Sequence, residues 1–326
     1  MNSYKQQTHC GLVVNYQCNA ACRHCLYACS PERNSDYMSV DTANRITKLL
    51  KEKGINTLHV GGGEPFLNFK GLLKVIDVIY EAGMEVEYVE TNGFWATNDI
   101  QVVQNLKALE RAGVKRLLIS LDPFHAEYVP VRLPLSLAEI CEKIGFDYFL
   151  WQEQFRKTLA CLEVDKVHSR ADMEKEISSN YFLEAVKNSG VNIYAGRAIN
   201  IIKEFCPRKP VKDILAESQP CHNLLQANFL HVDLYEQYIM PTCTGITIPL
   251  VEAVKGISQG RYKVFETLAM EGVVGLLKFI EENEYEIREE YASQCVLCFE
   301  IRQCLSKTGN YPELNAEYYE AALKYY

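Results

Sequence analysis

Three cysteines near the start of the chain carry its clearest chemistry. They lie in the segment Cys18-Asn-Ala-Ala-Cys22-Arg-His-Cys25, a C-x3-C-x2-C spacing. Such a loop can present three thiolates to one metal cluster, whereas electron-transfer [4Fe-4S] proteins close the cluster with four cysteines. Three ligands leave one iron open, and an open iron can bind a substrate-like ligand. A zinc knuckle is the alternative use of these thiols.

A glycine-rich turn follows the cysteines. The segment Gly61-Gly62-Gly63-Glu64-Pro65 comes directly after a short apolar run, Leu58-His-Val60. Taken alone, the glycines indicate a tight strand-to-helix turn. Taken with the cysteines, they resemble the radical S-adenosylmethionine (SAM) superfamily, whose cluster loop follows the first strand and whose Gly-Gly-Glu ends the second.

The resemblance implies a cofactor arrangement. The three cysteines would hold a [4Fe-4S] cluster, and the amino and carboxylate groups of SAM would chelate the open iron. One electron would then cleave SAM to a 5′-deoxyadenosyl radical, which removes a hydrogen from the substrate. Gly62 and Gly63 would let the backbone approach SAM closely, and Glu64 would pair with the SAM ammonium.

Further polar residues are candidates for binding the cofactor. Asn92 belongs to a Thr-Asn-Gly segment after the third predicted strand. Ser120 and Asp122 resemble the pair that family members place near the SAM ribose, although Ser-Leu-Asp-Pro is also a good turn. Arg197, in a Gly-Arg-Ala segment, resembles an arginine that lies near the SAM carboxylate, and a surface arginine is the alternative.

A second group of cysteines lies in the last third of the chain. Its members are Cys221, Cys243, Cys295, Cys298 and Cys304. Two cysteines flanking a predicted hairpin, followed by a distant C-x2-C, resemble the twitch form of the auxiliary-cluster domain. The longer SPASM form has a cysteine where this chain has Thr308. The resemblance implies one auxiliary [4Fe-4S] cluster with five candidates for four places, and a zinc ribbon would use the same thiolates.

The segment from Asp122 to His125 gives a finer resemblance. An Asp-x-x-His at this strand end occurs in radical SAM peptide epimerases, which return a hydrogen from a cysteine thiol. Asp122 and His125 are therefore catalytic candidates, and Cys243 or Cys304 would be the hydrogen donor. The other five thiols are expected to be buried apolar groups, of which Cys29 and Cys206 are candidates for lining the site. They are Cys10, Cys29, Cys141, Cys161 and Cys206.

The composition bounds the partners. The 326 residues are 48% apolar and 23% charged, with a net charge of −8. There is no basic footprint for nucleic acid and no apolar run long enough to span a membrane. No signal-peptide pattern is present, so we expect a cytoplasmic protein in which 13 cysteines serve metal ligation or catalysis rather than disulfides. The charge fits small metabolites and neutral or basic peptides.

Alternating apolar runs and helical-period segments must position these residues. From about residue 10 to 200 they predict repeated βα units on a parallel sheet. Helices are expected from near Ser39 to Gly54 and through Leu72 to Gly83. The predicted strands are Gly11–Asn15, Thr57–Val60, Glu85–Glu90, Lys115–Leu121, Phe146–Trp151 and Val191–Tyr194. All the N-terminal motifs follow strand ends, where such barrels carry their chemistry.

The predicted fold is α/β, a partial (β/α)6 TIM-like barrel with a small C-terminal twitch/SPASM-like domain. The radical SAM barrel would span residues 1–205 and the auxiliary-cluster domain residues 206–326. In the second part, Ala227–Asp233 and Gln237–Met240 are expected to form a hairpin, and Leu250–Glu290 a long helical stretch.

The leading hypothesis is a radical SAM enzyme that modifies a ribosomally made peptide by epimerisation or cross-linking. Its cofactors would be SAM and two [4Fe-4S] clusters, and its reductant a flavodoxin or ferredoxin. About nine residues precede the first predicted strand, so we expect no leader-binding module ahead of it. The alternatives are a twitch-type dehydrogenase or ring-forming enzyme acting on a small metabolite, and a non-catalytic iron-sulfur or zinc scaffold.

Overall fold

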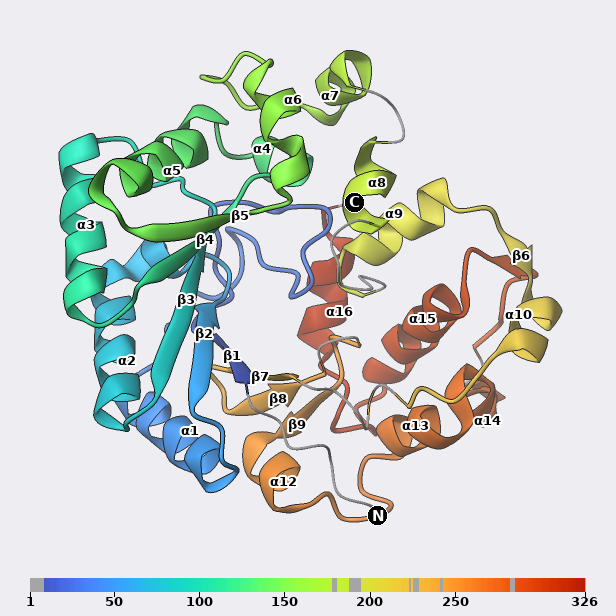
Figure 1. Cartoon of the computed structure of the whole chain (residues 1–326). Helices are drawn as coiled ribbons and strands as arrows, with labels where there is room; N and C mark the ends of the chain where they lie inside the picture. Colours follow the sequence, from blue (N-terminus) through green and yellow to red (C-terminus); the bar gives the residue numbers. More distant parts are fainter. Residues whose placement is uncertain are drawn as a thin grey trace.

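A central sheet organises the chain in the computed structural model (Figure 1). The structure describes residues 9–177, 181–187, 195–222, 224, 229–240, 243–281 and 285–325. Within these residues the sheet has eight strands in the order β5-β4-β3-β2-β1-β7-β8-β9. Their bounds are β1 His9–Val13, β2 Thr57–Gly61, β3 Glu85–Thr91, β4 Arg116–Ser120, β5 Asp147–Trp151, β7 Phe229–Asp233, β8 Gln237–Ile239 and β9 Thr247–Pro249.

The sheet is parallel from β5 through β1 to β7. The first five predicted strands are confirmed, each within two residues of its predicted bounds. The predicted sixth strand, Val191–Tyr194, lies outside the described residues. Beside β1 the structure places β7 instead, parallel to it and with His9 opposite Phe229 and Val13 opposite Asp233. The two short strands β8 and β9 then continue the sheet in antiparallel pairs.

Helices cover the outer face of the parallel strands, as the connections of a parallel sheet require (Figure 1). On β2, Leu58 and Val60 are fully buried, whereas His59 between them lines an inner cavity. The helices between strands are α1 Val40–Glu52, α2 Phe69–Glu81, α3 Asp99–Arg111, α4 Pro123–Ala126 and α5 Arg132–Ile144. Farther along are α6 Arg156–Ala160, α7 Arg170–Glu176, α8 Tyr181–Lys187 and α9 Ala198–Phe205.

The first two helices begin and end where the sequence predicts. The Ser39 hydroxyl accepts a hydrogen bond from Thr42 N at 3.1 Å and so caps α1. Gly54 and Gly83 follow α1 and α2 with φ of 79° and 68°, a left-handed conformation that favours glycine. These ends set the lengths of the connections and therefore bring each following strand back beside the previous one.

The C-terminal part consists mainly of helices packed beside the hairpin. The bounds are α10 Val211–Glu217, α12 Leu250–Lys255, α13 Lys263–Gly275, α14 Leu277–Glu281, α15 Gln294–Ser306 and α16 Ala316–Leu323. Two short strands, β6 Lys209–Pro210 and β10 Glu290–Tyr291, pair in a separate ribbon. The prediction of one long helical stretch over Leu250–Glu290 is wrong. Gly256 has φ 116° and Gly272 φ 67°, so the backbone turns at both positions, and residues 285–289 are not helical.

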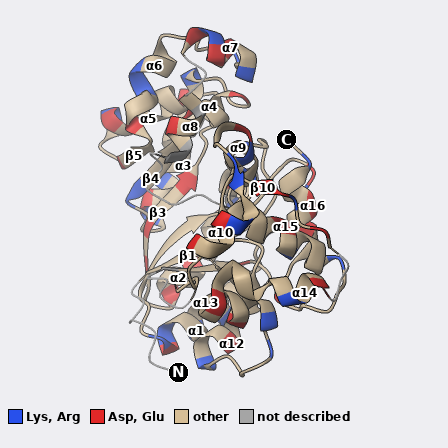
Figure 2. Cartoon of the chain, turned by 90° about the vertical axis from the view of Figure 1, so that its right-hand side faces the viewer, with Lys and Arg blue, Asp and Glu red and all other residues tan. Residues whose placement is uncertain are grey.

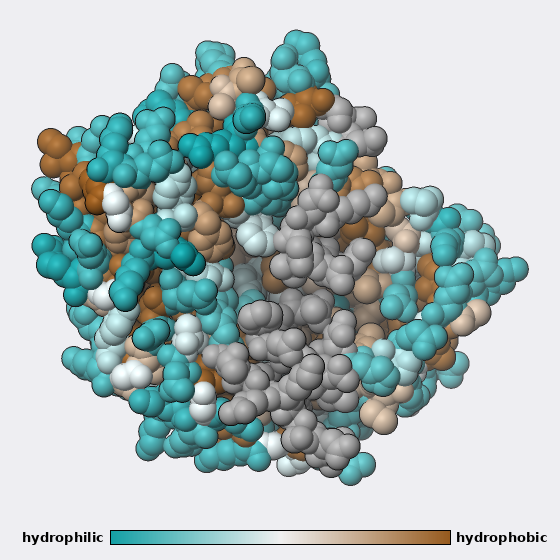
Figure 3. Space-filling model, in the orientation of Figure 1, coloured by the Kyte–Doolittle hydropathy of each residue, from teal (hydrophilic) through white to brown (hydrophobic). Residues whose placement is uncertain are grey.

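The surface carries mixed charge and scattered hydrophobic groups. Figure 2 shows acidic and basic segments interspersed over the C-terminal helices. Figure 3, in the orientation of Figure 1, shows hydrophobic side chains in small separate groups on this face of the molecule. The most exposed large ones, Ile100 of α3 and Met270 of α13, are on separate elements. Among the described helices, none has the length and apolar character needed to cross a membrane.

Candidate active site

A cavity of about 390 Å³ lies within the parallel strands and the loops that follow them. Its walls include all three cysteines of the C-x3-C-x2-C loop and the residues from Gly61 to Pro65. Asn92 and Ser120, at the ends of β3 and β4, also line it. The structure thus brings together side chains that the sequence places at four strand ends.

The cluster loop buries its thiols at one end of this cavity. Cys18 and Cys22 are 7% and 5% exposed, and Cys25 is half-buried. Backbone N–H groups reach two sulfurs, from Ala20 to Cys18 Sγ at 3.4 Å and from Cys29 to Cys25 Sγ at 3.3 Å. Burial raises the pKa of the Cys18 and Cys22 thiols. Buried thiolates therefore need a cationic partner, and three convergent thiols suit a metal cluster.

The glycines are required by contact with the chain itself. A Cβ on Gly62 would lie 2.5 Å from Asn15 Oδ1, and one on Gly63 would lie 2.0 Å from Gln17 O. The backbone pairs there, with Gly63 N donating to Asn15 O at 2.7 Å. Close packing of the turn on the start of the cluster loop accounts for both glycines. Their predicted approach to SAM stays a prediction.

Glu64 is held rigidly at the cavity wall. Its side chain is buried and accepts hydrogen bonds from Phe66 N at 3.1 Å, Thr91 Oγ1 at 2.9 Å and Asn92 N at 2.8 Å. Burial raises the pKa of its carboxyl to about 7, against the effect of these donors. A fixed, poorly solvated carboxylate favours a ligand that brings a positive charge.

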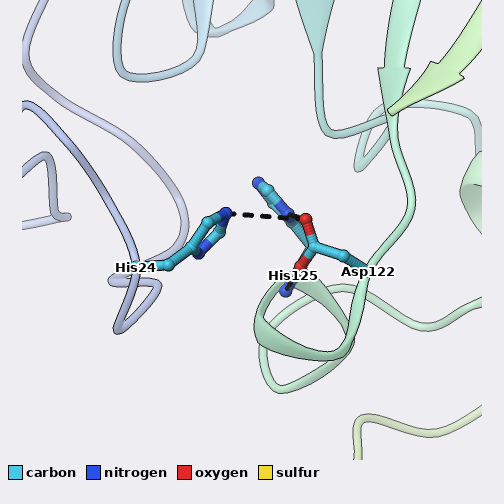
Figure 4. A group of neighbouring side chains, drawn as sticks. All are labelled: His24, Asp122 and His125. Atoms are coloured by element: carbon cyan, nitrogen blue, oxygen red, sulfur yellow. Dashed lines mark hydrogen bonds and ion pairs between the residues drawn. The ribbon is translucent and has the colours of Figure 1, made fainter. Parts of the chain in front are cut away.

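Asp122 lies behind the cavity rather than in its wall. It is fully buried, and its Oδ1 caps α4 by accepting from Phe124 N at 2.9 Å and His125 N at 3.0 Å. Its Oδ2 meets His125 Nδ1 at 2.8 Å and His24 Nε2 at 3.5 Å, and Figure 4 shows both rings directed at this carboxylate. The predicted contact of Asp122 with the SAM ribose is therefore not favoured by this arrangement.

His125 links this carboxylate to the cluster loop. Burial alone would lower the pKa of His125, but the Asp122 carboxylate and a hydrogen bond with the Cys22 thiol raise it well above its ordinary value. Burial lowers the pKa of His24 to about 4, against the pull of Asp122. The ion pair between Asp122 and His125 thus fixes the ring that touches Cys22. The link of Cys22 to His125 was not predicted, although the Asp-x-x-His spacing is the signal for the pair.

Arg197 holds the cluster loop by hydrogen bonds to backbone carbonyl groups of that loop. It is 1% exposed, its Nε donates to Cys22 O at 2.9 Å, and its Nη2 donates to Cys29 O. Its backbone N donates to Cys25 O at 3.1 Å. Arg197 does not line the cavity, so the structure makes it a support for the loop, and its predicted contact with the SAM carboxylate stays a prediction.

Four of the five C-terminal cysteines are neighbours. Burial raises the pKa of Cys221 to about 12, and the nearby Cys298 and Cys243 thiols add to the shift. Burial also raises the pKa of Cys295 to about 12, and the thiols of Cys243, Cys298 and Cys221 add to the shift. Cys304 follows Cys295 by nine residues on α15, which places it on roughly the opposite side of the helix. The structure therefore groups Cys221, Cys243, Cys295 and Cys298 and leaves Cys304 apart.

A buried cation stands beside this group. Arg302 is 2% exposed, and its Nη1 donates to Tyr319 Oη at 2.9 Å and to Thr244 O at 3.3 Å. Its Nε has no hydrogen-bond partner among the described atoms. The Cys298 and Cys243 thiols are among the groups that raise its pKa against the effect of burial. A buried arginine with an unused donor fits an anionic group held by these four sulfurs.

The predicted hydrogen donors are not placed in the cavity. Neither Cys243 nor Cys304 lines it, because Cys243 lies with the auxiliary group and Cys304 on the far side of α15. The structure therefore does not support either thiol as a donor in this cavity. Of the two other thiols proposed to line the site, Cys29 does so and Cys206 does not.

A polar inner wall of the cavity was not predicted from the sequence. His59, Tyr88, Glu90 and His231 project from β2, β3 and β7 into the cavity. The period-two alternation on β2 and β3 would have placed His59 with Gly61, and Tyr88 with Glu90, on one face. The pairing of β7 with β1, which brings in His231, has no such signal.

Comparison with known proteins agrees with this geometry. Residues 12–150 match the radical SAM superfamily model, which covers most of the strands and loops that form the cavity. This part of the chain belongs to the radical SAM superfamily. The putative peptide biosynthesis protein YydG of Bacillus subtilis (strain 168) is 29% identical over 116 residues, 36% of each chain. GTP 3',8-cyclase of Helicobacter pylori (strain HPAG1) is 31% identical over 120 residues, 36% of this chain and 35% of the cyclase.

The chain spans about a third of the length of those curated relatives in each alignment. Among solved structures, the crystal structure of Streptococcus suis SuiB bound to precursor peptide SuiA is 12% identical, with a TM-score of 0.35. That alignment covers 96% of this chain and 75% of SuiB.

Proposed function

We propose that this protein is a radical SAM enzyme that removes a hydrogen atom from a ribosomally made peptide. The observation that carries the proposal is the convergence of three thiols and Glu64 on one cavity inside a radical SAM domain. The relative named as a putative peptide biosynthesis protein supports a peptide substrate. Epimerisation and cross-linking are the two reaction types we propose to distinguish.

The chain's residues fit a [4Fe-4S] cluster and SAM. Cys18, Cys22 and Cys25 would hold the cluster, with N–H donors already directed at two of the sulfurs. When bound, the cluster supplies the electron that cleaves SAM to a 5′-deoxyadenosyl radical. Glu64 would bind the SAM ammonium. Arg197 would hold the conformation of the cluster loop by donating hydrogen bonds to two carbonyl groups of that loop.

We further propose an auxiliary [4Fe-4S] cluster on the C-terminal cysteines. Cys221, Cys243, Cys295 and Cys298 would be its four ligands, and the buried Arg302 would offset part of its negative charge. Full ligation by four cysteines suits electron transfer rather than substrate binding. A flavodoxin or ferredoxin would supply the low-potential electrons.

A small-metabolite substrate is the second candidate, because a GTP 3',8-cyclase is also among the relatives. The cavity argues against a nucleoside triphosphate. No lysine or arginine of the described residues lines it, whereas phosphate groups are normally bound by such cations. The charge of the cavity wall therefore favours a peptide over a nucleotide.

The test of the peptide proposal is turnover in deuterated water with short peptides encoded beside the gene. We expect 5′-deoxyadenosine to carry hydrogen from the peptide. An epimerised peptide would gain one deuterium, whereas a cross-linked peptide would lose two hydrogens and gain no deuterium. If SAM is cleaved but no adjacent peptide changes in mass or stereochemistry, the peptide proposal is wrong and small metabolites become the substrates to test.

A further inference from the structure

Glu90 is a carboxylate in the cavity wall, and no lysine or arginine among the described residues pairs with it. It lies on β3, and its side chain is 35% exposed. In the described part of the chain it accepts no hydrogen bond, and its one ion-pair contact is with His59 Nε2 at 3.8 Å. That distance exceeds the length of a hydrogen bond. Glu90 thus differs from Glu64, which is held by three donors.

The neighbouring imidazoles supply no positive charge. Burial lowers the pKa of His231 to about 4 and that of His59 well below its ordinary value, so both rings are neutral near pH 7. Each ring is also hydrogen-bonded to another side chain. His59 Nδ1 pairs with His9 Nε2 at 2.7 Å, and His231 Nδ1 pairs with Tyr27 Oη. The third ring, His125, is paired through Nδ1 with Asp122 Oδ2 at 2.8 Å.

The cavity therefore holds two carboxylates and no lysine or arginine of the described residues. Burial raises the pKa of Glu90 to about 7, and the Glu64 carboxylate adds to the shift. SAM carries two positive groups, an ammonium, which the proposed function assigns to Glu64, and a sulfonium, which has no N–H or O–H to donate to a carboxylate. A cation that donates hydrogen bonds to Glu90 must therefore come from the other ligand of the cavity.

We infer that Glu90 binds an ammonium or guanidinium group of the substrate. The inference rests on the proposed function and narrows its substrate to a peptide with a lysine, an arginine or a free amino terminus near the reacting residue. Tyr88, Leu118 and Trp151 line the same cavity. Their apolar surfaces suit the methylene stem of a basic side chain.

Gly61 offers an independent way to disturb this site. A Cβ built on Gly61 would lie 2.5 Å from Glu90 Oε2, and its three nearest atoms all belong to Glu90. A Gly61→Ala change should therefore push the carboxylate aside while leaving its charge in place. Glu90→Gln removes the charge and keeps the size. The two variants should give the same loss if the carboxylate is the binding group.

The experiment measures peptide binding by calorimetry to the anaerobically reconstituted, SAM-loaded protein. The probes are acetyl-Gly-Lys-Gly-amide and its neutral norleucine counterpart. We expect the lysine peptide to bind about tenfold or more tightly than the norleucine peptide, since a charge-assisted contact is worth roughly 1.5–3 kcal/mol. Glu90→Gln and Gly61→Ala should both remove this preference, and Glu90→Gln should leave SAM affinity unchanged. Glu85→Gln, an exposed residue of the same strand, should keep it.

Several results would overturn the inference. These are equal binding of both peptides, no binding of either to the wild-type protein, or a preference that survives in Glu90→Gln. A loss of SAM affinity in Glu90→Gln would assign Glu90 to SAM instead. The proposed function fails separately, because its failure would appear as a reconstituted wild-type protein that forms no 5′-deoxyadenosine or that leaves every adjacent peptide unchanged.

Discussion

Glu64 is the residue whose chemistry the structure defines most closely. Three donors from the turn and from the end of β3 fix both of its carboxylate oxygens. A ligand that binds Glu64 therefore loses little free energy to ordering this side chain. Burial keeps its pKa near 7 in the absence of a ligand cation. A bound ammonium would stabilise the ionised form and lower that pKa.

We expect Glu64→Gln to weaken SAM binding by about ten- to a hundredfold while cluster assembly survives. Ionised Glu64 is lost as the pH falls through about 7, so wild-type affinity should fall there as well. The variant lacks this titration, and the ratio of the two affinities should therefore shrink toward one at low pH. Calorimetry across the pH range measures both effects, with Glu85→Gln as the control. Equal affinities above pH 7 would make Glu64 purely a structural residue.

At the scale of elements, local sequence patterns predicted the strands and helix ends of the parallel sheet. They did not predict which distant strands pair. The five βα units follow from alternating apolar runs. Ser39 marks the start of a helix through its capping side chain, and Gly54 and Gly83 mark helix ends through their left-handed backbone. The place of β7 beside β1 joins segments about 200 residues apart, and no local pattern encodes such a pairing. His231 and the inner wall therefore became visible only in the fold.

The grouping of the C-terminal cysteines was open for the same reason. The C-x2-C spacing predicts that Cys295 and Cys298 share a helix face, but the sequence does not show which side of α15 meets Cys221 and Cys243. The structure settles this by packing α15 against α9, α13 and α16. Arg302, one turn after Cys298, then falls beside the same thiols.

This grouping predicts how iron content responds to substitution. The reconstituted wild type should hold about eight irons, and Cys295→Ala with Cys298→Ala should reduce that to about four. Cys304→Ala is the matched control on the same helix and should retain about eight. Iron and sulfide analysis with Mössbauer spectra measures the change. Loss of iron in the Cys304 variant, with full iron in the double variant, would refute the grouping.

At the scale of the whole molecule, the two cysteine groups are joined by α16. Tyr318 Oη donates to Leu26 O in the cluster loop at 3.2 Å and also contacts Thr244 Oγ1, next to Cys243. Arg302 binds the carbonyl of the same threonine. The loop of the first cluster and the proposed auxiliary site are therefore positioned by one set of buried hydrogen bonds. The cavity is lined both by the cluster loop and by the inner wall of the sheet, which includes His59 and Glu90.

The central claim is that Cys18, Cys22 and Cys25 support reductive cleavage of SAM. Formation of 5′-deoxyadenosine by the anaerobically reconstituted, dithionite-reduced chain tests it most directly. The wild type should form this product, as should a Cys161→Ala, Cys206→Ala control. Alanine at all three loop positions should abolish it while about four irons remain on the C-terminal cysteines. A triple variant that still forms 5′-deoxyadenosine at the wild-type rate would contradict the account.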